Sequence, residues 1–180
     1  MTPGERERAI NELHESRERL LAAVRRLSPS QLAYKPAADR WSVAECIEHI
    51  ILVETSILRA IEKTVQQPGD APQGAIEDGA LLAKVVDRSA PMKGPERLMP
   101  TGRWAHDQLF GEFESTRKRT SEFASTTDAK LRESAFPHPA FGPLDCYQWL
   151  LLIAAHGERH RAQAEEVMAS PGFPRAASAS

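Results

Sequence analysis

Apolar residues recur every three or four positions along several long segments, a pattern that places them on one face of an α-helix. In the first segment, about residues 5–27, this face consists of Ile10, Leu13, Leu20, Leu21, Val24 and Leu27. Ser28-Pro29 follows, and proline cannot continue a helix. The pattern therefore predicts an amphipathic helix over residues 5–27.

Two capping boxes mark the starts of further helices: Ser42 with Glu45, and Asp145 with Gln148. In this motif the capping residue and the residue three positions later each satisfy a backbone N–H of the other. The first box predicts a helix that runs to about Val65. The second box predicts a last helix from Cys146 to about Ala169.

The region between these two helices is more varied. Proline and glycine are concentrated between Gln66 and Gly102, which predicts a long crossover with one short helix at about residues 76–88. A further long helix is predicted at about residues 103–125, with the charges of EFESTRKR on its outer side. Its inner side carries Trp104, Leu109, Phe113 and Phe123. FPHPAFGPLD is predicted to be a structured loop, because no segment alternates as a strand does.

Four long helices with one long connection predict an all-α four-helix bundle. The shorter links favour antiparallel neighbours within the first and within the second pair of helices, and the long crossover allows the second and third helices to run parallel. The 180 residues fit one domain, which we place at residues 1–170, followed by a disordered tail at residues 171–180.

Charge and composition exclude several classes of partner. The 23 Lys and Arg residues nearly balance the 25 Asp and Glu residues, and no basic stripe with interleaved aromatic residues appears. Nucleic acid is therefore not expected as a partner. The N-terminus MTPGERERAI is charged, and no apolar run approaches the roughly 18 residues of a membrane span. We expect a soluble cytoplasmic protein.

The two cysteines, Cys46 and Cys146, have no C-x-x-C spacing. Neither a disulfide framework nor a cysteine-rich zinc site is indicated. The prediction is two free, buried thiols.

Two histidines interrupt the apolar stripe of the last helix. At about 100° per residue, one narrow sector of this helix contains Trp149, Leu152, Ile153, His156, His160, Gln163 and Val167. Two imidazole rings that point into the bundle cost free energy unless their nitrogens find partners. One interpretation is metal ligation by the H-x-x-x-H pair, and the other is a hydrogen-bonded pair of core histidines.

A third ligand is sought on another helix, and His49 is the best candidate. It shares its side of the helix with Cys46, Val53 and Ile57, so it is also predicted to face inward. Three neutral imidazoles leave open positions on a zinc-like ion, as in catalytic sites. Gln163 could hydrogen-bond a ligand or a substrate there.

Four further residues have two interpretations each. Glu45 either orients His49 from behind or serves only in the capping box, and the second is favoured. Cys46 is a core residue or a further soft ligand. His106 is a core histidine or lines the site, and Arg17 either extends its charged end to solvent or contacts an anion in the pocket. We favour the interpretation of Cys46 as a core residue, and that of Arg17 as a side chain whose charged end extends to solvent.

The remaining histidines are outside this pattern. His14 lies among charged residues and is predicted to be solvated. His138 lies in the PHP turn, where it could border the mouth of the bundle.

Three motifs in order resemble the DinB-like superfamily: WSVAECIEH at residues 41–49, HPAFGPL at 138–144, and HGERHRAQ at 156–163. The resemblance covers about residues 8–168. It implies a four-helix bundle with up-down-down-up topology and a divalent metal held by His49, His156 and His160. Three imidazoles with open positions suit zinc, nickel, iron or copper, of which zinc and nickel are expected.

The resemblance implies several activities. The superfamily includes S-transferases that use bacillithiol-type low-molecular-weight thiols, metal-dependent hydrolases and members without known activity. A thiol transferase, with that thiol as a second cofactor and a small-molecule substrate, is the first hypothesis. A hydrolase and a noncatalytic metal-binding or stress-response module are the alternatives. The residue after His156 is Gly157, so the carboxylate of an H-E-x-x-H protease motif is missing. Many bundles of this kind pair through an exposed apolar helix face, so a homodimer is plausible.

Overall fold

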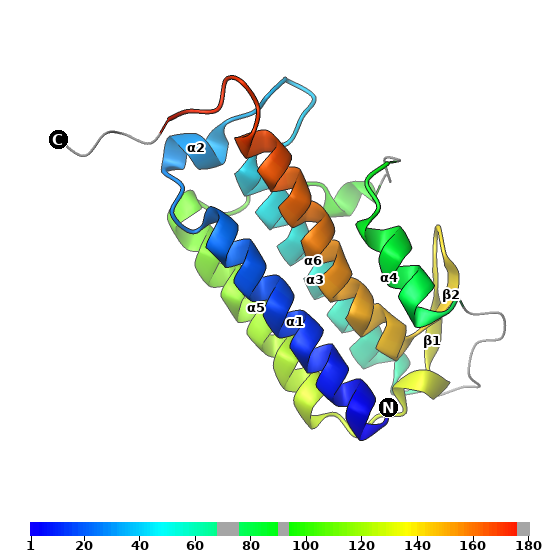
Figure 1. Cartoon of the computed structure of the whole chain (residues 1–180). Helices are drawn as coiled ribbons and strands as arrows, with labels where there is room; N and C mark the ends of the chain where they lie inside the picture. The colour runs from blue at the N-terminus through cyan, green and yellow to red at the C-terminus, as the bar shows by residue number, and fades with distance from the viewer. Residues whose placement is uncertain (68–75, 90–93, 176–180) are drawn as a thin grey trace.

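The computed structural model describes residues 1–67, 76–89 and 94–175, and Figure 1 shows them as an elongated helical bundle. The six α-helices are α1 (Pro3–Val24), α2 (Pro29–Ala33), α3 (Val43–Thr64), α4 (Asp78–Val86), α5 (His106–Thr126) and α6 (Cys146–Met168). Two 3₁₀ turns, Glu96–Leu98 and Leu131–Glu133, and a hairpin of β1 (Ala135–His138) and β2 (Gly142–Asp145) complete the described elements.

The four long helices run up, down, down and up, as the resemblance to the DinB-like superfamily implied (Figure 1). The chain leaves α3 at one end of the bundle and enters α5 at the other end, so the crossover must return along the full length of the bundle. Helix α4 lies on this return path and packs against α6. The predicted short helix at residues 76–88 corresponds to α4.

The predicted neighbour relations within the bundle were wrong. Helix α1 packs against α5 and α6, and α3 packs against the same two helices, so α1 and α3 lie diagonally opposite each other. The links at 25–42 and 127–145 are not tight turns, because they contain α2 and the hairpin. They are therefore long enough to span the diagonal of the bundle, and antiparallel helices need not be adjacent.

Capping boxes start four of the described helices, two more than the sequence predicted. Both predicted boxes are present. Thr2 with Glu5 starts α1 at Pro3, earlier than predicted, and Ser28 with Gln31 starts the short helix α2, which was missed.

Helix α5 begins at His106, three residues later than predicted. The carboxylate of Glu48 accepts hydrogen bonds from the backbone N–H groups of Thr101, Gly102 and Arg103, at 2.8, 2.9 and 3.3 Å. These amides hold the crossover against α3. Trp104 consequently precedes the helix, although it still packs against the core.

The predicted loop at residues 136–145 is largely a hairpin, in which β1 and β2 pair antiparallel. Its two prolines face each other, Pro137 opposite Pro143, and they obscure the alternation by which a strand is recognised. Gly142 has a φ of 74°, which favours glycine at this turn. The Phe136 ring stacks on Trp149 at 4.4 Å and secures the hairpin to α6.

A buried ion pair crosses the centre of the bundle and corrects the prediction that Arg117 lies on the outer side of its helix. Arg117 and Glu54 are each 1% exposed, with guanidinium–carboxylate distances of 3.0–3.1 Å. Arg117 also donates to the Leu13 carbonyl and the Ser16 hydroxyl, both at 2.6 Å. One side chain on α5 thus connects α1 and α3 across the bundle diagonal.

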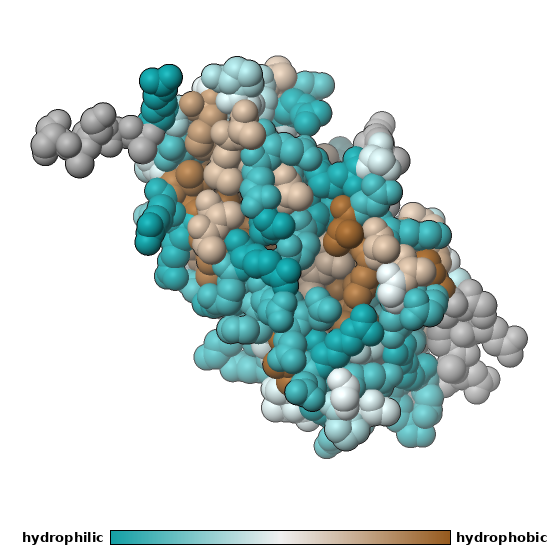
Figure 2. All heavy atoms as spheres, in the orientation of Figure 1, coloured by the Kyte–Doolittle hydropathy of each residue, from teal (hydrophilic) through white to brown (hydrophobic). Residues whose placement is uncertain are grey.

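Both cysteines are free and buried, as predicted. The bundle surface in Figure 2 is mostly hydrophilic, with hydrophobic residues gathered over α4 and close to α2. No helix among the described residues is long and apolar enough to cross a membrane. Of the predicted disordered tail, residues 176–180 lie outside the described residues.

The buried ion pair generates a stability prediction. Arg117→Ala leaves the Glu54 carboxylate buried without its cation, so the free energy of unfolding should fall by roughly 3–5 kcal/mol. Urea denaturation measures this loss. The matched control is Lys118→Ala, because Lys118 pairs with Glu122 while 75% exposed, and we expect a change within about 0.5 kcal/mol. Equal stabilities of the two variants would contradict the prediction.

Candidate metal centre

The three predicted ligand histidines come together between α3 and α6. One ligand atom from each of His49, His156 and His160 lies within 4.8 Å of the other two. Their ring centroids are 4.4 to 5.1 Å apart. Two nitrogens bound to one zinc ion at about 2.1 Å lie at most about 4.2 Å apart. Small side-chain rotations therefore allow the three rings to share one ion.

Helix geometry explains the convergence. His156 and His160 are one turn apart on α6, so both rings project from one face of that helix. Helix α3 packs on α6 and presents His49, in its second turn, to the same space. His49 and His160 are 6% and 7% exposed, whereas His156 is more accessible.

Protein acceptors orient two of the rings. His49 Nδ1 lies 2.8 Å from the Leu98 carbonyl oxygen, and His160 Nδ1 lies 2.9 Å from Gln163 Oε1. A carbonyl oxygen can only accept, so Nδ1 carries the proton in both rings. Nε2 then keeps its lone pair, which is the state that binds a metal. Gln163 therefore contacts the back of His160.

Burial keeps the rings neutral. Desolvation lowers the pKa of His49, although its bond to Leu98 opposes this effect. The pKa of His160 falls to about 3, mainly by burial and then by the nearby His49. His156 is partly accessible as a residue, yet burial of its ring, together with the nearby His160, holds its pKa well below the ordinary value. At neutral pH all three rings are available as ligands without losing a proton.

An aromatic residue that sequence reasoning did not assign to the site covers two of the ligands. The Trp41 ring lies 4.8 Å from the His49 ring and stacks on His160 at 5.7 Å. Trp41 immediately precedes Ser42, the N-cap of α3, so the cap fixes its position. The only sequence signal was its place in the WS motif.

The crossover also contributes to the centre, and the sequence did not indicate which of its residues do so. Glu48 is 3% exposed and holds residues 101–103, and the same segment brings the Leu98 carbonyl to His49. A Cβ at Gly94 would lie 3.8 Å from His49 Cε1, so the backbone passes close to that ring. The one signal in the sequence was Glu48 itself, a carboxylate directly before the inward-facing His49.

Two other predicted residues have structural roles. Glu45 accepts from Ser42 N at 2.7 Å and pairs with Lys35 at 2.9 Å, while the Leu98 carbonyl orients His49. Cys46 is buried outside the ligand group, and burial raises its pKa to about 12, so it remains a thiol at neutral pH.

The remaining candidates also lie outside the three-histidine group. His106 is the half-buried first residue of α5. His138 stacks on Phe141 at 4.5 Å in the hairpin. His14 is exposed, and Arg17 is 30% exposed and pairs with Glu114 at 2.5 Å, so its charged end lies at the bundle surface.

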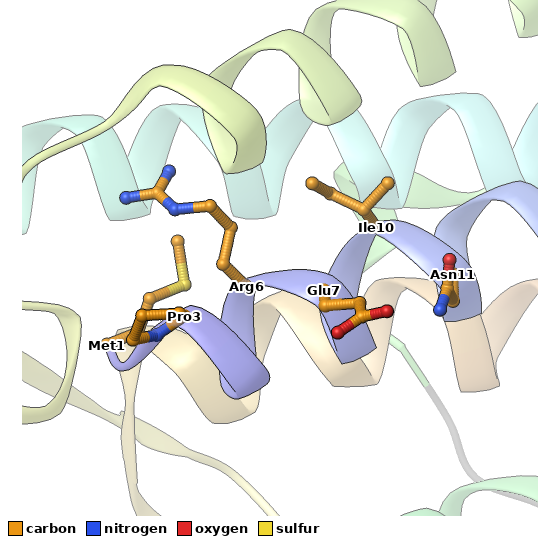
Figure 3. Close-up of a pocket in the computed structure, with 6 residues that line it drawn as sticks. All are labelled: Met1, Pro3, Arg6, Glu7, Ile10 and Asn11. Carbon is orange, nitrogen blue, oxygen red and sulfur yellow. The ribbon is translucent and has the colours of Figure 1, made fainter.

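A hollow of about 370 Å³ lies elsewhere, along the first turns of α1 (Figure 3). It is lined by Met1, Pro3, Arg6, Glu7, Ile10 and Asn11. The Arg6 guanidinium is engaged by the carbonyls of Ala124 and Ser125, both at 2.8 Å. Arg6 thus holds the end of α5. The histidine cluster, whose nitrogens can bind a metal ion, is therefore the candidate functional site.

Fold and ligand set together describe a helical bundle with a candidate three-histidine metal centre. The chain belongs to the DinB superfamily, which matches residues 12–164 and confirms the resemblance in the sequence motifs. It is similar to the uncharacterized protein YuaE of Bacillus subtilis (strain 168), with 30% identity over 146 residues, 78% of this chain and 85% of YuaE.

Two solved structures share the fold. YfiT from Bacillus subtilis, described as a probable metal-dependent hydrolase with an unusual four-helix bundle topology, has a TM-score of 0.62 and 18% identity over 97% of this chain and 91% of YfiT. TT2238, a four-helix bundle protein, has a TM-score of 0.57 and 22% identity over 89% of this chain and 98% of its own.

The depressed histidine pKa values generate a pH prediction for the metal-free protein. Unfolding returns the pKa of His160 from about 3 to its ordinary 6.5. Between these values the unfolded state binds more protons, so stability is complete above about pH 6.5 and decreases as the pH falls. At pH 5 the loss from His160 alone is about 2 kcal/mol.

Urea denaturation at pH 7.5 and pH 5.0 measures this loss. The variant His160→Gln should lose less stability than the wild type between the two pH values. His14→Gln, a change at an exposed histidine of α1, should retain the wild-type difference. An unchanged pH dependence in His160→Gln would contradict the assignment.

Proposed function

We propose that the protein is a metal-dependent enzyme that transfers a low-molecular-weight thiol of the bacillithiol type to a small electrophilic substrate. The observation that carries this proposal is the incomplete ligand set. The group contains three histidines and no fourth His, Cys, Asp or Glu among the described residues. A structural zinc site is normally closed by four protein ligands, whereas a catalytic site keeps a position for water or substrate.

The residues of the centre have distinct tasks in this proposal. His49, His156 and His160 would hold the ion, with Leu98 and Gln163 keeping two rings in the binding tautomer. A divalent ion bound there would lower the pKa of a coordinated thiol or water and so supply a nucleophile near neutral pH. Trp41 shields two of the rings and limits access of solvent from its side.

The surrounding carboxylates favour a thiol over water as the nucleophile. The carboxylates of Glu45 and Glu48, which precede His49 on α3, are engaged by Ser42 and Lys35 and by the crossover amides, respectively. Hydrolysis benefits from a general base beside the attacking water. A thiol has a much lower intrinsic pKa than water, so when either binds the ion the thiol depends less on such a group.

Metal-dependent hydrolysis is the second candidate. It is favoured by the similarity to YfiT, the probable metal-dependent hydrolase with the same fold. In this reaction a substrate group would assist deprotonation of the attacking water. The two candidates differ in one requirement, because only the transferase needs an added thiol.

Elemental analysis of untagged protein is the first test of the centre. We expect about one zinc or nickel ion per chain in the wild type, and loss of at least 90% of that metal in His49→Ala and His160→Ala, because two imidazoles hold an ion weakly. His14→Ala is the matched control, since it removes an exposed histidine. A wild-type protein that neither contains nor acquires metal would exclude both enzymatic candidates.

Activity assays on the metal-loaded protein then separate the candidates. Conversion of a small electrophile only when a bacillithiol-type thiol is added would support transfer. Thiol-independent ester or amide cleavage that disappears in His160→Ala would instead establish the hydrolase. Stable metal binding without an exchangeable solvent or thiol ligand would identify a noncatalytic metal-binding module and exclude both.

A further inference from the structure

We propose that Arg88, two residues after the crossover helix α4, is a positioning residue that fixes the tautomer of His160 through Gln163. The inference rests on the proposed function, because the tautomer matters there as a condition for metal binding. Arg88 contacts Gln163 directly, and we infer that it acts on His160 through that contact.

The three side chains form a chain of contacts. Gln163 Oε1 accepts from His160 Nδ1 at 2.9 Å and from Arg88 Nη1 at 3.3 Å. The other side of the guanidinium makes two hydrogen bonds to the Glu166 carboxylate, at 2.9 and 2.7 Å. Arg88 thus connects two residues that lie one turn apart on α6.

Arginine has one property that glutamine and histidine lack, because its guanidinium only donates hydrogen bonds. The Gln163 amide has an oxygen that accepts and a nitrogen that donates, and a half-turn exchanges them. Facing Arg88, the amide must present its oxygen. The same oxygen faces His160, so the proton of that ring must sit on Nδ1 and the lone pair on Nε2.

Removal of Arg88 eliminates this constraint. The Gln163 amide can then turn and donate its N–H to His160 Nδ1. The imidazole proton moves to Nε2 by exchange with solvent, and the ring stays neutral. A protonated Nε2 has no lone pair for an ion, so this second state competes with metal binding.

His49 provides an internal comparison. Its Nδ1 faces the Leu98 carbonyl, a backbone group that can only accept. That ring therefore needs no additional residue to define its tautomer. The amide of Gln163 is ambiguous where the peptide carbonyl is not, and Arg88 removes the ambiguity.

Arg88 is itself held in place by its neighbours. Its side chain is 21% exposed, so it has limited freedom to move away. The Arg159 guanidinium binds the carbonyl oxygens of Val85, at 3.2 Å, and of Asp87. These bonds attach the end of α4 to α6 at Arg159, one residue before His160. Arg88 is therefore held against the helix that carries His160.

The test uses metal-free, full-length protein labelled with ¹⁵N at histidine. Long-range ¹H–¹⁵N spectra at pH 7.5 report which nitrogen of each ring is protonated. In the wild type we expect His160 to be protonated at Nδ1. In Arg88→Met we expect a substantial Nε2-protonated population, and zinc affinity measured by competition with a chelator should fall about 10- to 100-fold.

Three further variants separate this role from a general loss of structure. Arg88→Lys should retain the wild-type tautomer, because an ammonium group also only donates. Arg88→Met combined with Gln163→Glu should restore it, because a carboxylate only accepts. Arg40→Ala is the matched control, since Arg40 approaches the same Glu166 carboxylate at 4.0 Å, and it should behave as the wild type.

The outcomes distinguish this inference from the proposed function. An unchanged His160 tautomer in Arg88→Met overturns the inference, whatever the zinc affinity. Failure of the double variant to restore the tautomer also overturns it. If the tautomer responds as expected but the wild type never binds zinc or nickel, the inference holds and the metal-dependent function fails.

Discussion

Imidazole rings can be buried between packed helices only if their nitrogens are satisfied, and this requirement governs the end of the bundle where α3 begins and α6 ends. Two rings donate from Nδ1 to protein oxygens, one from the Leu98 backbone and one from the Gln163 side chain. One nitrogen from each of the three rings lies within 4.8 Å of the other two, close enough for a single cation to be shared among them. Burial of the three rings requires partners for their nitrogens, and a bound ion is one such partner.

The topology and the centre depend on each other. Because α3 and α5 run in the same direction, the chain between them must travel back along the bundle (Figure 1). That returning segment supplies Leu98 to His49 and Arg88 to the back of His160. Glu48 fastens the end of the segment to α3 through backbone amides. A bundle with only tight turns would have no segment in position to make these contacts.

Helical periodicity and capping chemistry were sufficient to predict the long helices and the three inward histidines, because both signals are local. The identity of the residues behind the rings was not predictable in the same way. Arg117 shows why. Its charged neighbours in EFESTRKR suggest a solvated face, but its buried partner Glu54 lies on another helix, α3, far away in the sequence. Likewise, Leu98 acts through its carbonyl, which leaves no trace in a side-chain pattern. The hairpin was missed because its paired prolines conceal a strand.

The order of the ligands along the chain has a consequence for biosynthesis. His49 belongs to the second of the four long helices, whereas His156 and His160 belong to the last. A ribosome must therefore release α6 as far as His160 before the three rings can meet. Until then His49 is a solitary histidine, and two imidazoles on α6 offer only a weak chelate. The three-histidine arrangement therefore forms only after α6 has been made and packed, so the candidate centre cannot assemble on an incomplete chain.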